Sequence, residues 1–270
     1  MKLGVGVIIF SGAEFLKPML KCLRNFAYYI VGVYSMKSYT GSDIAPYVLP
    51  LLEELKEEEL LDETMNFSFD MTNIAVRCQE LEREKRGYAQ NRCVEVGCTH
   101  FLVCDIDEFY FPNQFRYAMK KAEKEEMTIC KLYDYVHSPL YRGKTTSILH
   151  IPFIHRIGAE YYADEKDYPV LMDLSRVTKS KSHYVFSENE IVMHHMTAVR
   201  YNMKEMKRKF EGHAHYVRLG QKRADEYIDW VCNFNIADNK NEYIKVNDNF
   251  GILEYWRKEF KDFYERYNNA

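Results

Sequence analysis

An acidic motif in the middle of the chain offers the clearest chemistry. Asp105 and Asp107 stand two residues apart, with Glu108 beside them, directly after the apolar run at 101–104. Such a run is typical of a buried parallel strand, which normally ends at the ligand-binding edge of an open α/β sheet. Two carboxylates at that edge suit a divalent cation whose other ligands are substrate phosphates. The motif therefore predicts a metal–diphosphate site at a solvent-facing edge; a helix cap with surface acids is the alternative.

A pair of histidines is the second candidate. His194 and His195 end a short apolar run that begins at Ile191. Because adjacent strand residues point to opposite faces, only one of them is expected to face the acidic motif. An imidazole nitrogen is a borderline ligand that favours Mn²⁺ over Mg²⁺. We predict one metal ligand and one packed residue, without deciding which is which; a purely structural pair is the alternative.

Positive charge gathers late in the chain, between residues 200 and 223. This segment holds eight Lys or Arg residues against two Glu, a local surplus of six positive charges. The surplus predicts a face for a diphosphate or another anion, with Arg200 as the first candidate, and a solvated helix face is the alternative. Lys85 and Arg86, earlier in the chain, are open to the same two interpretations.

The elements that must position these residues alternate between strand and helix. Apolar runs predict strands, amphipathic spacing predicts helices, and Gly97 stands where a helix C-terminal glycine belongs. This alternation predicts an α/β fold with a mostly parallel central sheet flanked by helices. The expected elements before the acidic motif are strands at 2–10, 29–34 and 65–69 and helices at 14–26, 46–61 and 74–96.

The second half of the chain has a weaker pattern. We expect strands at 127–135 and 191–195, and two more within 144–162 with a turn near Gly158. From Tyr201 onward the sequence turns helical, charged and aromatic. The expected organisation is therefore a catalytic α/β domain at 1–200, followed by a helical, basic and aromatic C-terminal extension at 201–270.

Composition bounds the class of protein. The 270 residues are 47% hydrophobic and 29% charged, which suits one large packed domain or a domain with an appendage. No apolar run approaches the ~20 residues of a membrane span, and no secretory leader pattern opens the chain. The cysteine count is odd, at seven, without a Cys-x-x-Cys pair, which favours free thiols in the cytoplasm over zinc or disulfides.

Several stretches together resemble family-2-type glycosyltransferases of the GT-A fold. Lys85-Arg86 on a helix is followed by Gly-Cys-Thr-His-Phe-Leu at 97–102 and by Asp-Ile-Asp-Glu-Phe-Tyr at 105–110. Later stretches at 172–176 and 193–200, which contain the paired histidines and Arg200, are similar to the same group in the same order. The resemblance spans roughly residues 1–210.

The resemblance implies a nucleotide-sugar donor of the UDP or GDP type and a Mn²⁺ or Mg²⁺ ion. It implies that Asp105 and Asp107 hold the ion, with a third ligand at His194 or His195, and that Asp107 is catalytic. The residues expected at the donor are Phe10, Ser11, Gly12, Lys85, Arg86, Asp105 and Arg200.

The chain also departs from the family pattern. Gly87 replaces the Asn expected after Lys-Arg, and Tyr34-Ser35 stands where many relatives place an acid near the nucleobase. No clear Glu-Asp base motif is present. A base must accept the proton of the acceptor hydroxyl, and we choose Asp173 for that role. The other candidates are Asp164, Glu165 and Asp167.

The acceptor and two rival functions stay open. The acceptor is either a glycan or a hydroxymethylated pyrimidine in DNA, because the basic segment suits a polyanion. A haloacid-dehalogenase-type phosphatase also has an apolar strand before Asp-x-Asp, but that family carries it on the first strand. The third possibility is a non-catalytic carbohydrate- or nucleic-acid-binding module, which donor turnover would exclude.

Overall fold

The first half of the chain forms a parallel sheet. The computed structural model describes residues 1–72, 74–161, 168–212 and 221–268. Its N-terminal strands stand in the order β3-β2-β1-β4, all parallel, with Val5 opposite both Ile30 and Leu102. The strands are β1 (Leu3–Ile9), β2 (Tyr29–Tyr34), β3 (Glu63–Asn66) and β4 (His100–Asp105).

The sheet continues beyond β4 with mixed pairing. Next to β4 lies β8, antiparallel, and then β6, which pairs antiparallel with β8 and parallel with β10. The short β5 returns antiparallel against β10, so the turn that carries the acidic motif lies beside the paired histidines. The bounds are β5 (Glu108–Phe109), β6 (Met127–His137), β7 (Tyr141–Gly143), β8 (His150–Arg156), β9 (His183–Val185) and β10 (Val192–Val199).

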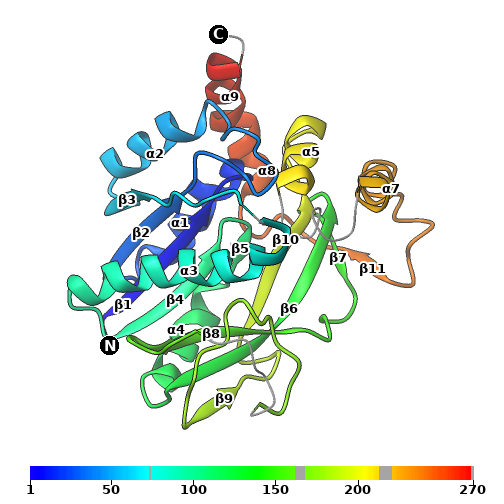
Figure 1. The fold of residues 1–270 in the computed structure, drawn as a ribbon. Helices are drawn as coiled ribbons and strands as arrows, with labels where there is room; N and C mark the ends of the chain where they lie inside the picture. Colours follow the sequence, from blue (N-terminus) through cyan, green and yellow to red (C-terminus); the bar gives the residue numbers. More distant parts are fainter. Residues whose placement is uncertain (73, 162–167, 213–220, 269–270) are drawn as a thin grey trace.

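Helices cover both faces of this sheet (Figure 1). Helix α3 packs through Ala89 and Cys93 on one face, while α1 and α4 pack on the other. The predicted α/β class, with a mostly parallel central sheet and flanking helices, is confirmed. The helices are η1 (Ala13–Phe15), α1 (Leu16–Leu23), α2 (Val48–Glu57), α3 (Ile74–Glu95) and α4 (Pro112–Ala122).

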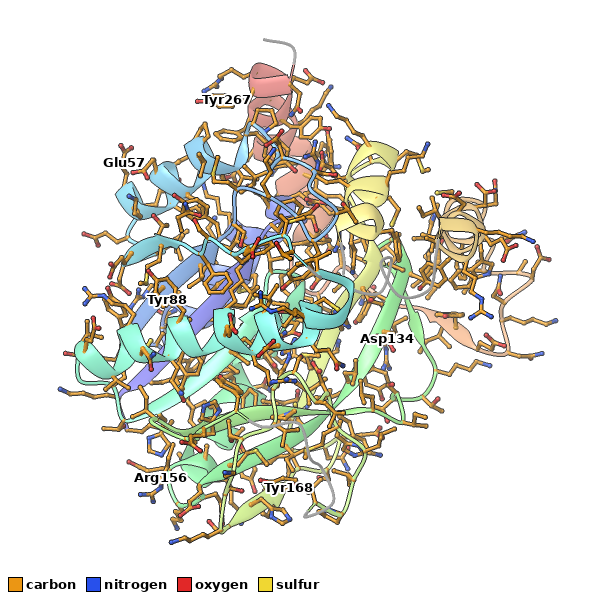
Figure 2. The ribbon with its side chains drawn as sticks, viewed as in Figure 1. Glu57, Tyr88, Asp134, Arg156, Tyr168 and Tyr267 are labelled. Carbon is orange, nitrogen blue, oxygen red and sulfur yellow. The ribbon has the colours of Figure 1, made fainter. Side chains whose placement is uncertain are left out.

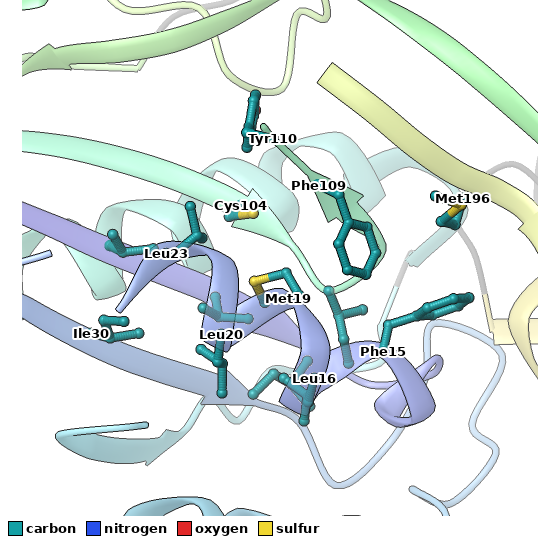
Figure 3. Close-up of a cluster of buried hydrophobic side chains, with 14 of the residues drawn as sticks. Phe15, Leu16, Met19, Leu20, Leu23, Ile30, Cys104, Phe109, Tyr110 and Met196 are labelled. Atoms are coloured by element: carbon teal, nitrogen blue, oxygen red, sulfur yellow. The ribbon is translucent and has the colours of Figure 1, made fainter. Parts of the chain in front are cut away.

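Glycine lets α3 approach β1 closely. A Cβ added at Gly6 would lie 2.8 Å from the Cβ of Ala89 and 2.6 Å from the ring of Phe101, closer than packed atoms approach. On the opposite face, Figure 3 shows Phe109 of β5 beside Phe15, and their ring centroids are 6.0 Å apart. This packing holds the end of the acidic turn against the core.

The C-terminal part is mostly helical, as predicted, and adds one short strand. Trp256 and Phe260 pack into the same core as β1, and the Trp256 indole donates to the carbonyl of Glu14 at 2.9 Å. Whether residues 201–270 form a separate unit stays a prediction. No helix in the described ranges combines the length and apolar content of a membrane crossing. The elements are α5 (Met203–Gly212), α7 (Gln221–Cys232), β11 (Tyr243–Lys245), α8 (Ile252–Tyr255), η2 (Trp256–Phe260) and α9 (Lys261–Asn268).

Candidate active site

Most of the predicted site residues line one cavity of about 580 Å³. It opens at the carboxyl ends of β1 and β4, beside α3, β10 and the loop before β9. Gly12 adjoins it: a Cβ there would lie 3.6 Å from the Arg200 guanidinium, and its φ of +89° suits glycine. The predicted residues that line the cavity are Phe10, Ser11, Lys85, Arg86, Asp105, Asp107, Asp173, His195 and Arg200.

The acidic turn is shaped by Glu108 and by Arg176, which the sequence analysis included in the 172–176 stretch without giving it a role. The Asp105 backbone N–H donates to Glu108 Oε2 at 3.1 Å, which closes the turn. Arg176 donates to Glu108 at 2.9 Å and to Asp105 Oδ2 at 2.6 Å, and its Nε donates to Asp173 at 3.1 Å. Arg176 therefore ties the loop before β9 to the motif.

Asp107 is buried, with 4% of its surface exposed, so the expectation of a solvent-facing carboxylate was wrong. Asp107 lies against β10, the link that follows it and α5, which carry His195, Arg200 and Lys209 respectively. Arg200 and Lys209 donate to Asp107 Oδ2 at 2.8 and 3.1 Å. Burial alone would raise the pKa of Asp107, but Lys209, Arg200 and His195 hold it well below its usual value.

The two histidines point to opposite faces of β10. His195 lies in the cavity, with Nε2 at 3.6 Å from Asp107 Oδ1. Burial would lower its pKa, but the Asp107 carboxylate raises it to about 9. His194 packs on the other face: Nδ1 is 2.8 Å from the Tyr135 hydroxyl, and its ring meets Phe111 at 4.7 Å between centroids. Of the two candidates, His195 is the one that faces the acidic motif.

The donor atoms near Asp107 fit a divalent cation. In the described ranges no three His, Cys, Asp or Glu side chains converge as a complete metal site. Asp107 Oδ1 and His195 Nε2 are 3.6 Å apart, however, so one ion with bonds of about 2.1 Å can touch both. The side chain of Asp105 is 31% exposed nearby, paired with Arg86 and Arg176. Mg²⁺-like ions need only one or two carboxylates when phosphates supply other ligands.

Cations face the same space. Arg86 donates to Asp105 at 3.3 Å, while its Nε and one terminal nitrogen are buried without a hydrogen-bond partner in the described structure. Lys85 donates to the Ile9 carbonyl at 3.1 Å, and burial lowers its pKa to about 7. The Arg200 guanidinium is oriented by the carbonyls of Met196 and Val199. The cavity thus presents donors to an anion.

Asp173 is bound on both carboxylate oxygens. Oδ1 accepts the N–H and hydroxyl of Ser175 at 3.0 and 2.6 Å, and Oδ2 accepts from Arg176. Burial opposes ionisation, but Arg176 and Arg86 lower the pKa of Asp173 to about 2. A carboxylate held this way accepts a proton poorly, so its role as the base stays a prediction that its environment disfavours. Asp164, Glu165 and Asp167 lie outside the described residues.

The basic segment does not act as one face. Arg200 and Lys209 turn into the cavity, whereas Lys207, Lys222 and Arg223 are exposed. Arg218 lies outside the described residues. Lys209 was visible in the sequence only as one charge among eight. Asp134, another cavity residue that sequence reasoning missed, carries no motif of its own.

Comparisons with known proteins add limited similarity. No protein-family model and no curated protein matches the chain. A crystal structure of Staphylococcus aureus TarS covers 100% of the chain at 11% identity and a TM-score of 0.45, and this chain spans 55% of that one. TarS 1-349 in complex with UDP-GlcNAc is 12% identical over 99% of this chain and 82% of its own, with a TM-score of 0.43. Mannose-1-phosphate geranyltransferase from Thermus thermophilus is 10% identical over 53% of this chain and 45% of its own, with a TM-score of 0.30.

Proposed function

We propose that this protein is a metal-dependent GT-A glycosyltransferase that moves a sugar from a nucleotide-sugar donor to an acceptor hydroxyl. The observation that carries the proposal is the convergence, in one cavity, of the Asp107–His195 pair with Arg86, Arg200 and Lys209. The first pair suits a divalent cation, and the cations suit a diphosphate. The motif resemblance described above supports the same proposal.

The cations of the cavity would bind and orient the diphosphate. Two nitrogens of Arg86 are buried without a partner in the described structure, and a buried unpaired N–H costs about 1–3 kcal/mol. A phosphate oxygen that accepts these groups removes this penalty, so the cavity favours an anionic ligand. Arg200 is already fixed by two carbonyls and Asp107, so its guanidinium loses little freedom when a ligand binds.

In the transition state, negative charge develops on the departing nucleoside diphosphate, and the site must stabilise that charge. Asp107, His195 and Asp105 would hold Mn²⁺ or Mg²⁺, which would supply a Lewis acid for that charge. Lys209 and Arg200 lie within hydrogen-bond reach of Asp107, in a site largely shielded from water. Fixed cations in such a site stabilise developing charge more strongly than they would in water.

The acceptor proposal keeps both hydroxyl sources, a glycan or a hydroxymethylated pyrimidine in DNA. Lys207, Lys222 and Arg223 are exposed and lie outside the cavity lining, and such cations are the ones that phosphates of a duplex can reach.

None of the seven cysteines, all in the described ranges, forms a disulfide, which fits a reducing cytoplasm.

The proposal is tested by turnover of UDP- and GDP-sugars with Mn²⁺ and with excess EDTA. We expect nucleoside diphosphate release from at least one donor, lost in EDTA and in Arg86→Met. The Glu188→Gln variant is the matched control, because Glu188 pairs with Lys131 outside the cavity. Absence of release from every donor, together with no thermal stabilisation by UDP or GDP, would refute the proposal.

A further inference from the structure

His195 stands between two carboxylates. Strands β10 and β6 are parallel neighbours, and His195 is directly opposite Asp134 in their register. The Nδ1 atom of His195 is 3.4 Å from Asp134 Oδ1, and its Nε2 atom is 3.6 Å from Asp107 Oδ1. Asp134, labelled on β6 in Figure 2, lines the same cavity. Asp134, His195 and Asp107 therefore form a continuous row from three segments of the chain.

The contacts of Asp134 point to His195. In the described ranges its carboxylate accepts no hydrogen bond and has His195 as its ion-pair partner, and the Nδ1 atom of His195 is buried without a hydrogen bond. The side chain of His195 is 23% exposed, so packing alone leaves the ring partly free. An imidazole has two distinct nitrogens, and the bond that one of them makes sets the state of the other. A carboxylate at Nδ1 therefore determines what Nε2 can do.

We propose that Asp134 is a positioning residue, which accepts the Nδ1–H of His195 and keeps Nε2 facing Asp107 as a ligand for the divalent cation. This inference rests on the proposed function, because it assigns the partner of one proposed metal ligand. When a carboxylate that orients a metal-binding histidine is replaced, metal affinity or activity typically falls about 10–100-fold.

A purely structural ion pair would behave differently. The side chain of Asp134 is 43% exposed, and ion pairs this open contribute little to folding stability. Replacement of Asp134 is therefore expected to leave the protein folded while it releases the ring. Metal affinity, measured without nucleotide or turnover, separates orientation of His195 from support of the fold.

The experiment measures Mn²⁺ affinity of the full chain by titration calorimetry in four proteins: wild type, Asp134→Asn, His195→Ala and the double variant. We expect Asp134→Asn to weaken Mn²⁺ binding about 10–100-fold. His195→Ala should weaken it at least as much, and the double variant no further, because Asp134 acts through His195. Asp134→Glu should restore part of the affinity. Glu188→Gln, which removes a carboxylate of similar exposure outside the cavity, should have no effect.

Three results would overturn the inference: wild type that binds no Mn²⁺, an Asp134→Asn affinity within twofold of wild type, or additive losses in the double variant. Nucleotide-sugar turnover, measured on the same proteins, keeps this result apart from the proposed function. If wild type turns over nucleotide sugars but the Mn²⁺ affinity does not change in Asp134→Asn, this inference is refuted and the proposed function is not. Absence of both turnover and nucleotide binding defeats the proposed function.

Discussion

The two faces of β10 place the same residue type in opposite environments. His195 faces the cavity, between Asp107 and Asp134. His194, the preceding residue, lies among Tyr135, Phe111 and Phe250. Burial lowers the pKa of both rings. On the cavity face the Asp107 carboxylate reverses that effect and raises the pKa of His195 to about 9, whereas on the aromatic face the pKa of His194 falls to about 3.

The comparison shows that the partner, rather than the residue type, decides the chemistry. A histidine beside a buried carboxylate carries charge in the metal-free protein, so a divalent cation at its Nε2 would have to displace a proton. A histidine enclosed by aromatic rings stays neutral and acts as a packed side chain with one hydrogen bond. The two-residue period of the strand is enough to place one ring in the cavity and its neighbour among packed aromatic side chains.

The cavity face depends most on Asp107, so its loss should have the largest effect. Asp107→Asn leaves Arg200 and Lys209 without their carboxylate, and breaking a buried pair costs about 3–5 kcal/mol. We expect turnover to be nearly abolished and urea unfolding to shift to lower denaturant. Full activity of the folded variant would remove Asp107 from the proposed chemistry.

For folding stability, in contrast to turnover, we expect His194 to matter more than His195. His194→Ala removes a buried ring from an aromatic cluster, so we expect its unfolding free energy to fall by about 2–4 kcal/mol. His195→Ala removes a partly exposed ring, with an expected loss of about 1 kcal/mol or less in EDTA near pH 9, where most of the contribution of its ion pair with Asp107 is gone. Urea unfolding of both variants measures the difference, and equal losses would break the comparison.

The pH dependence of stability should also differ between the faces. The folded-state pKa of His194 is about 3, below its usual 6.5, so the unfolded chain binds the proton more tightly. Stability is therefore lost as pH falls below 6.5. From pH 7 to 5, wild type should lose about 2 kcal/mol more than His194→Gln, at ~1.4 kcal/mol per pH unit.

His195 carries the opposite sign, because its pKa is raised to about 9. Its contribution is fully present below pH 6.5 and is lost as pH rises through 9. In EDTA, wild type should therefore lose more stability than His195→Gln between pH 7 and 9. Parallel pH profiles for wild type and both Gln variants would show that neither ring titrates as described.

The sequence predicts much of the arrangement of the acidic motif and the paired histidines, but it does not predict which distant side chains contact them. The apolar strand at 101–104 and the acids after it were visible, because strand patterning and residue type are local. The opposite orientation of His194 and His195 also followed from strand geometry. The burial of Asp107 did not, because Lys209 reaches it from a helix about one hundred residues later. Asp134 had no local signal either, since only the register of β6 and β10 places it at His195.

Strand lengths were less predictable than strand positions, and of the two strands expected within 144–162 the described residues form one, β8. The run at 191–195 extends to Val199 in the structure, because pairing with β6 continues through Val199 despite an irregular register after His195. The strand expected at 65–69 begins at Glu63 and ends at Asn66. Such bounds depend on which neighbour supplies the hydrogen bonds, which one sequence does not specify.

The smallest expected effect concerns the exposed cations, which lie away from both faces of β10. Lys207, Lys222 and Arg223 replaced together by Glu should leave donor turnover unchanged. Lys209 and Arg208 are excluded from this set because they bond Asp107 and the Asp43 carbonyl. If the acceptor is DNA, duplex affinity should fall, and its log–log salt slope should lose up to about 0.9 per phosphate contact. Absence of binding at low salt leaves the glycan acceptor.

The most direct test of the account is the binding of UDP and GDP, measured by titration calorimetry with Mn²⁺ and with EDTA. We expect one nucleotide to bind the wild type in Mn²⁺ and to bind at least tenfold more weakly in EDTA. His195→Ala should behave in Mn²⁺ as wild type does in EDTA, whereas folded His194→Ala should keep the wild-type affinity. Equal losses in the two variants, or no binding of either nucleotide by wild type, would contradict the assignment of the cavity face of β10 to the donor.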